Sequence, residues 1–144
     1  MAASSVTERS VRANGIDLHL AEAGPPSGAP VVLLHGFPDS WELWRSQVAA
    51  LAAAGYRVLA PDLRGFGRTT RPPAVEAYRS RTLVADVTGL LDAGDVERAA
   101  VVGHDWGAAL AWRVAMFAPD RVERLVAVSV GHPLAGVVAG LPQR

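Results

Sequence analysis

The period of the hydrophobic positions changes several times along the chain, and each change predicts a new element. Apolar and polar residues alternate over residues 16–23, which predicts a strand with one buried face. The preceding Asn14-Gly15 pair favours the two-residue turn of a β-hairpin, so residues 10–13 should form its first arm. The continuous apolar run at 31–34 is typical of a parallel strand that is covered on both faces.

The rest of the pattern alternates between helices and strands. Spacing of three or four positions predicts three helices: one between Asp39 and Gly55, one that starts at Ser80 or Thr82 and ends at Gly94, and one that follows Gly107 and stops at Pro119. Short apolar runs predict strands at 56–60, 99–102 and 125–130. Asp39 should cap the first helix, with Glu42 as its reciprocal partner, and Phe117 should be buried. A hairpin followed by this alternation predicts an α/β fold with a mostly parallel sheet and helices on both faces.

The amino-acid composition excludes several kinds of catalysis and gives no reason to expect several kinds of partner. The 144 residues hold 14 acidic and 14 basic residues, all of the latter arginine, with neither lysine nor cysteine. This balance gives no electrostatic reason to expect a nucleic-acid or membrane partner. Schiff-base chemistry, thiol catalysis and cysteine-ligated metals are excluded. We expect no metal, no cofactor and no membrane span, and a cytoplasmic location, because the N-terminus does not resemble a signal peptide.

One short motif carries the candidate chemistry. In Gly103-His104-Asp105-Trp106-Gly107, two glycines flank a central aspartate between a predicted strand and a predicted helix. This spacing is typical of a strand-to-helix elbow that presents a nucleophile, with aspartate in place of the more usual serine. The glycines are needed where side chains would collide in so sharp a turn. The alternative interpretation is that Asp105 is an ordinary helix N-cap.

Upstream and downstream stretches add a family resemblance. The chain resembles the N-terminal part of an α/β-hydrolase, specifically of the epoxide hydrolase group. Residues 1–144 would then be the N-terminal portion of the domain, an incomplete core that lacks the cap and the C-terminal strands. The stretches that match, in the family's order, are His35-Gly36-Phe37-Pro38 with Asp39-Ser40-Trp41, Asp62-Leu63-Arg64-Gly65-Phe66-Gly67, Val102-Gly103-His104-Asp105-Trp106-Gly107 and Ser129-Val130-Gly131-His132-Pro133.

The resemblance implies a mechanism and a set of site residues. Asp105 would attack a small apolar epoxide and form an ester, which water would then hydrolyse to a diol. The backbone N–H groups of Phe37 and Trp106 would form the oxyanion hole, and Phe37, Pro38 and Trp106 would line the substrate pocket. The resemblance implies a structural role, not a catalytic one, for four other polar residues of these motifs: His35, Asp62, Arg64 and His104.

The sequence departs from the family pattern after Asp105. The order in hydrolases is nucleophile, acid, histidine, yet only Asp120, Glu123 and His132 follow Asp105. None of them matches the charge-relay acid or the water-activating histidine, and Tyr56 and Tyr78 do not match the cap tyrosines. We therefore expect the chain alone to be inactive or to react once.

The last predicted strand bears on association. Val126, Val128 and Val130 would form an exposed apolar edge, which favours self-association or pairing with a partner chain.

Other functions remain open at this point. A haloalkane dehalogenase also places tryptophan after an aspartate nucleophile, but its second halide donor is usually an asparagine at the position of Phe37, whose side chain cannot donate. A non-catalytic, truncated hydrolase-fold fragment is a further alternative. A serine esterase is disfavoured because the elbow contains no serine.

Overall fold

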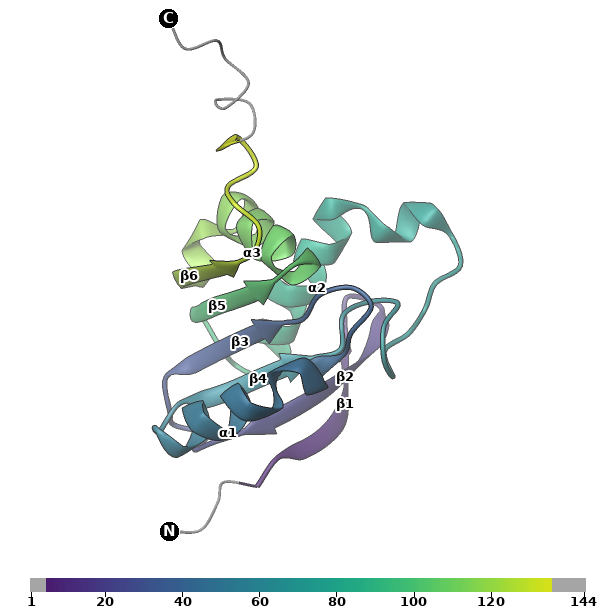
Figure 1. Ribbon diagram of the computed structural model, residues 1–144. Coiled ribbons are helices and arrows are strands. Elements are labelled where there is room, and N and C mark those ends of the chain that lie inside the picture. The colour runs from purple at the N-terminus through teal and green to yellow at the C-terminus, as the bar shows by residue number, and fades with distance from the viewer. Residues whose placement is uncertain (1–4, 136–144) are drawn as a thin grey trace, which may run out of the picture.

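The computed structural model describes residues 5–135, which form a six-stranded sheet in the order β1-β2-β4-β3-β5-β6 (Figure 1). Only β1–β2 and β2–β4 pair antiparallel, so the sheet is mostly parallel, as predicted. The elements in chain order are β1 (Thr7–Ala13), β2 (Ile16–Ala23), β3 (Pro30–Leu34), η1 (Trp41–Trp44), α1 (Arg45–Ala53), β4 (Arg57–Pro61), η2 (Val75–Tyr78), α2 (Ser80–Ala93), β5 (Ala99–His104), α3 (Trp106–Phe117), η3 (Pro119–Arg121) and β6 (Val122–Val128).

The predicted hairpin is confirmed. β1 and β2 pair in register from Thr7 opposite Glu22 to Ala13 opposite Ile16. The two residues between the strands, Asn14 and Gly15, have φ values of 49° and 76°, which is the backbone that a two-residue hairpin turn requires. The hairpin therefore joins the edge of the sheet through β2, which pairs with β4.

The helices cover both faces of the sheet, as expected from the alternating order. α1 lies in front of the sheet in Figure 1, and α2 and α3 lie behind it. Each face has its own apolar core. Leu34, Leu91 and Val114 belong to the larger core under α2 and α3, whereas Trp41, Val48 and Val58 belong to the smaller core under α1. Within residues 5–135, no helix is both long and apolar enough to cross a membrane.

Two local predictions are wrong for identifiable reasons. Ser40, not Asp39, caps the first helical turn, and its hydroxyl accepts the Glu42 N–H at 3.4 Å. Asp39 lies one residue too early, and its carboxylate accepts the Ser40 N–H instead. Phe117 is 44% exposed because it ends α3 beyond the sheet, where the Arg81 guanidinium lies 4.9 Å from the centre of its ring.

Candidate active site

The motif around Asp105 forms the sharp turn that its glycines predict. β5 ends at His104, α3 begins at Trp106, and Asp105 between them has φ 56° and ψ −120°, a conformation that side-chain-bearing residues rarely adopt. A Cβ atom on Gly103 would collide with the carbonyl oxygen of Gly107, and one on Gly107 would collide with that of Leu34. Both glycines are therefore required for close backbone approach.

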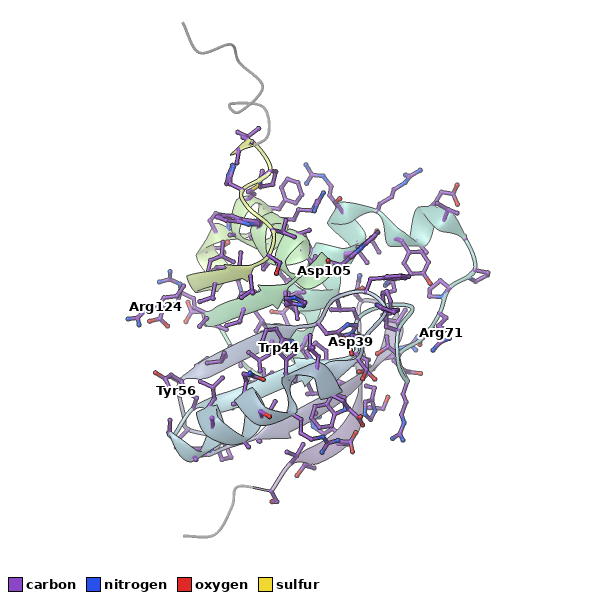
Figure 2. All side chains as sticks on the ribbon, viewed as in Figure 1. Asp39, Trp44, Tyr56, Arg71, Asp105 and Arg124 are labelled. Carbon is purple, nitrogen blue, oxygen red and sulfur yellow. The ribbon has the colours of Figure 1, made fainter. Side chains whose placement is uncertain are left out.

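The Asp105 side chain points to the loop that follows β3. The Phe37 N–H donates to Asp105 Oδ1 at 3.1 Å, across 68 residues of sequence. The side chain makes no capping hydrogen bond to α3, so the N-cap interpretation is wrong, although Asp105 occupies the N-cap position. The N–H groups of Phe37 and, to a lesser extent, Trp106 lower the pKa of Asp105, which is consequently ionised at neutral pH. Figure 2 shows Asp105 at the carboxyl end of the strands, where α/β folds bind ligands.

Aromatic rings surround this carboxylate. The ring of Phe37 lies 6.0 Å from that of Phe66 and 6.3 Å from that of Trp106, measured between centroids. Phe37 and Trp106 are each 63% exposed, an unusual state for two large apolar side chains that lie together. Pro38, which a cis peptide bond joins to Phe37, is also exposed beside them. The sequence-predicted site residues therefore lie in one place.

An open cleft lies directly beside Asp105. It is lined by Asp105, Trp106, Ala109, Arg113 and Val130, and so extends from the elbow along the first turns of α3. Its far wall is the segment after β6, which the Trp112 indole holds by donating to the Val130 carbonyl at 3.0 Å. Sequence reasoning missed this anchor, although a tryptophan seven residues after the aspartate was a visible signal.

The two histidines next to the motifs have structural contacts. His35 Nε2 accepts the Leu63 N–H at 2.9 Å, so its Nδ1 carries the proton and donates to the Gly36 carbonyl at 2.8 Å. Burial lowers the pKa of His35 and keeps its ring neutral. His104 points to the opposite face from Asp105, where it lines a shallow cleft with Leu43 and Val128. Neither ring is arranged as a base for Asp105.

Asp62 and Arg64 support the loops around the site. Both oxygens of the buried Asp62 accept main-chain N–H groups, from Trp41 at 2.8 Å and from Arg68 at 3.0 Å. Arg64 forms a two-bond ion pair with Asp86, with both bonds at 2.8 Å, and both side chains are buried. This ion pair was not predicted, since its members lie 22 positions apart and nothing in the sequence indicates that they meet.

Gly36 is a further functional position that sequence reasoning did not single out. A Cβ atom there would lie 2.6 Å from the Cβ atom of Asp105 and 3.0 Å from its Oδ1. Glycine is therefore needed for the loop after β3 to bring the Phe37 N–H to the carboxylate. The His-Gly pair in the motif was the available signal, but only the fold shows which residue the glycine must approach.

Comparison with known proteins assigns the part of the chain that holds this site to a family. The sequence model of a family described as "alpha/beta hydrolase fold" matches residues 29–139. The chain belongs to this family. The match begins just before β3 and spans the loop of Phe37, the loop of Asp62 and the elbow of Asp105. The predicted fold class agrees with this family, since the sheet is mostly parallel and helices cover both of its faces.

Several relatives of the chain are named epoxide hydrolases. It is 54% identical over 125 residues to epoxide hydrolase A of Mycobacterium tuberculosis and 46% identical over 123 residues to an AB hydrolase superfamily protein of Bacillus subtilis. The crystal structure of epoxide hydrolase A from Mycobacterium thermoresistibile matches 88% of the chain, with a TM-score of 0.86 and 49% identity. The chain spans 38%, 43% and 40% of the lengths of these three proteins, respectively.

Proposed function

We propose that the protein carries the nucleophilic half of an epoxide hydrolase, with Asp105 as the attacking group and a small apolar epoxide as the substrate. The observation that carries this proposal is the hydrogen bond from the Phe37 N–H to Asp105 Oδ1 at a strained elbow. It holds an ionised carboxylate in an open cleft among exposed aromatic rings. The names of the relatives support the choice of epoxide.

The first step forms an ester. A carboxylate oxygen of Asp105 attacks one epoxide carbon, the bond from that carbon to the ring oxygen breaks, and the electron pair moves to the oxygen. The resulting alkoxide takes a proton, from solvent in this chain, and becomes a hydroxyl group. Because hydrogen bonds to the main chain keep Asp105 ionised, no base is needed to activate it.

The second step releases the diol. Water adds to the ester carbonyl, and the developing oxyanion needs donors that are already in position. When the oxyanion collapses, the bond between the carbonyl carbon and the diol oxygen breaks, the diol leaves with a proton that came from the water, and the Asp105 carboxylate is restored. The N–H groups of Phe37 and Trp106 lower the pKa of the free carboxylate, so they already favour negative charge there and can serve as these donors. The same main-chain groups therefore act on the carboxylate in one step and on the oxyanion in the next.

A base for that water is not provided by the histidines of the described residues. His19 contacts Glu8, His35 bridges two loops, and the ring of His132 packs 5.0 Å from that of Trp112. His104 lies on the other face of the sheet. We therefore propose that the 144 residues by themselves form the Asp105 ester once and hydrolyse it too slowly for turnover.

Intact-mass measurement tests this proposal. The chain is incubated with styrene oxide at pH 7, beside the variant Asp105→Asn, whose amide is a poor nucleophile. The expected result is one added epoxide mass on the original chain, no addition on the variant and no continuing production of diol. Equal addition to both proteins would overturn the role of Asp105, and steady release of diol would overturn the single reaction.

We also propose that the chain self-associates through β6. Among the described residues β6 pairs only with β5, and its Val126 and Val128 are 49% and 43% exposed. An exposed strand edge beside apolar side chains favours pairing with another chain. Light scattering should show dimers or larger species, and the double variant Val126→Lys with Val128→Lys should shift them towards monomers. A monodisperse monomer at high concentration would contradict the proposal.

A further inference from the structure

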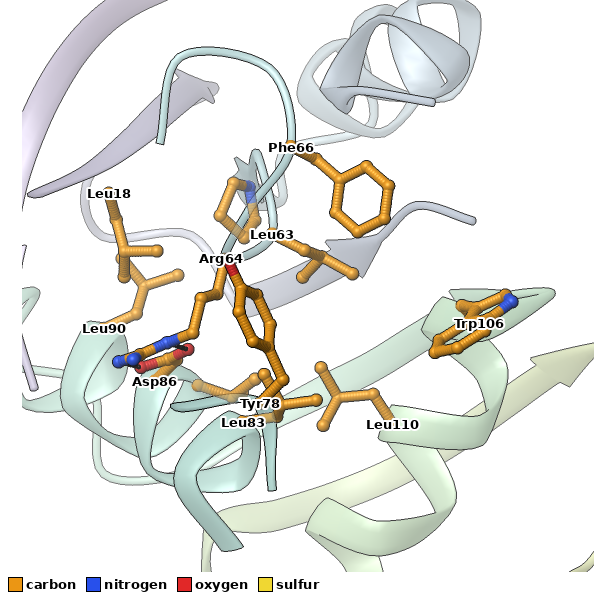
Figure 3. Close-up of a pocket in the computed structure, with 12 residues that line it drawn as sticks. Leu18, Leu63, Arg64, Phe66, Tyr78, Leu83, Asp86, Leu90, Trp106 and Leu110 are labelled. Carbon is orange, nitrogen blue, oxygen red and sulfur yellow. Dashed lines mark hydrogen bonds and ion pairs between the residues drawn. The ribbon is translucent and has the colours of Figure 1, made fainter. Parts of the chain in front are cut away.

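A partly open apolar cavity lies beside Trp106, separate from the cleft that holds Asp105. Its volume is about 100 Å³, and Figure 3 shows Trp106 and Phe66 at one side and the Arg64–Asp86 pair at the other. Side chains from β2, from the loop after β4 and from α2 and α3 line it. Those that this argument uses are Leu63, Phe66, Leu83, Leu90, Trp106 and Leu110.

The polar side chains in the wall of this cavity are already satisfied. Arg64 and Asp86 bind each other through two hydrogen bonds of 2.8 Å, and the Tyr78 hydroxyl donates to the Pro72 carbonyl at 2.8 Å. A water molecule inside would find few partners, and an apolar wall of this kind favours apolar guests. The chemistry of the wall therefore selects a hydrocarbon group.

Trp106 connects the cavity to the reacting carboxylate. The tryptophan lines both the cleft of Asp105 and this cavity, and its main-chain N–H is one of the groups that lower the pKa of Asp105. Phe66 lines the cavity too and contacts the ring of Phe37, which lies beside Asp105. The cavity and the cleft of Asp105 therefore adjoin each other at Trp106.

We infer that this cavity is the binding site for a short alkyl substituent of the epoxide. The inference rests on the proposed function, because it names the part of the substrate that lies beside Asp105. Size sets the class of substituent: a cavity of about 150 Å³ accepts benzene, whereas this one, at about 100 Å³, is smaller. It therefore suits a chain of two or three carbons better than a phenyl ring.

Leu83 offers the sharpest test. It lines the cavity from the first turn of α2 but is only partly buried, so its size can be changed without opening the main core. Leu83→Trp fills the cavity and Leu83→Ala enlarges it. Leu43→Trp is the matched control, because Leu43 is 38% exposed and lies on the other face of the sheet, against the smaller core.

The measurement is the rate constant for adduct formation on Asp105, followed by intact mass with ethylene oxide, 1,2-epoxybutane and styrene oxide. Burying two carbons is worth about tenfold in rate. Leu83→Trp should therefore lower the rate constant for 1,2-epoxybutane, relative to that for ethylene oxide, about tenfold. Leu43→Trp should leave this ratio of rate constants unchanged. Leu83→Ala should raise the rate constant for styrene oxide relative to that for ethylene oxide. This second variant keeps the test informative if the tryptophan variant folds poorly.

A second readout does not depend on the reaction. Xenon added to the ¹⁵N-labelled chain should shift the amide resonances of Trp106 and Leu110, and Leu83→Trp should abolish these shifts. The assignment of the cavity as the alkyl site would be overturned if xenon shifted no amide resonance of the original chain. It would also be overturned if the substitutions at Leu83 left the ratios of rate constants unchanged. Absence of any adduct on Asp105 would instead overturn the proposed function, and the alkyl site with it.

Discussion

Asp62 and Asp105 are two carboxylates held by main-chain N–H groups, but their surroundings differ. Asp62 is 1% exposed, and both of its oxygens accept an N–H, from Trp41 and Arg68. Asp105 accepts the Phe37 N–H at its Oδ1 and faces an open cleft. Both side chains follow parallel strands at the same end of the sheet, β4 for Asp62 and β5 for Asp105.

The difference shows how the same interaction serves two purposes. Around Asp62 the N–H groups come from two separate loops, so the carboxylate ties those loops together, and its burial keeps it from a ligand. Around Asp105 the backbone turn lifts the side chain out of the core, so the N–H groups keep it charged while the cleft leaves it accessible. Access to the carboxylate therefore separates a candidate nucleophile from a structural acid.

The largest expected change in stability comes from adding a methyl group at Gly107, inside the turn that holds Asp105. In Gly107→Ala the new Cβ atom would overlap the carbonyl oxygens of Leu34 and His35, which are main-chain atoms that cannot simply rotate away. Overpacking of this kind should lower the free energy of unfolding by about 3 kcal/mol, measured by urea denaturation. Gly131→Ala is the control, because among residues 5–135 a Cβ atom there would meet only Ala135, at 4.0 Å. The free energy of unfolding of this variant should stay within about 0.5 kcal/mol of the original.

Exchanging each carboxylate for an amide sharpens the comparison directly. Asp62→Asn turns an NH₂ group towards the N–H of Trp41 or Arg68, so we expect a loss of about 2 kcal/mol in the free energy of unfolding. Asp105→Asn should leave the urea midpoint unchanged while it abolishes adduct formation. If the two variants were equally destabilised, Asp105 would be a structural acid like Asp62.

A smaller effect should follow from moving the Phe37 loop away from Asp105. In Gly36→Ala the new methyl group would contact the Asp105 side chain and displace the Phe37 N–H, so the pKa of Asp105 should rise towards its ordinary value. A carboxyl-detected NMR titration of Asp105 in both proteins measures the change. An unaltered pKa in the variant would show that Phe37 is not its main cause.

The smallest effect concerns His35, which binds the loops next to the site. Burial lowers its pKa in the folded state, so the unfolded chain takes up the proton first as the pH falls. Stability should therefore be complete above about pH 6.5 and decline as the pH falls from there towards the folded pKa. Urea midpoints between pH 5 and pH 8 measure this decline, which His35→Gln should flatten.

Local patterns in the sequence predicted most of the fold. The Asn14-Gly15 turn set the register of the hairpin, and the glycines around Asp105 correctly indicated a backbone that comes too close for side chains. The N-cap was misassigned because Asp39 and Ser40 are both good capping residues, and only the path of the loop decides between them.

The parts of the site that could not be predicted depend on long-range contacts. Phe37 and Asp105 are 68 residues apart, and their pairing followed from the family resemblance and not from any local pattern. The Arg64–Asp86 pair and the cavity beside Trp106 depend on how a loop and two helices pack together. The spacing of residues along a chain carries no information about such packing.

The most direct test of the central claim is to locate the ester after the chain has reacted with an epoxide. The chain contains 14 acidic residues, many of them exposed, so peptide mapping by tandem mass spectrometry can compare them in a single experiment. If the elbow makes Asp105 the nucleophile, the ester will be found on Asp105 and on no other carboxylate. An ester spread over exposed acids such as Asp39 and Glu76, with none on Asp105, would contradict the account.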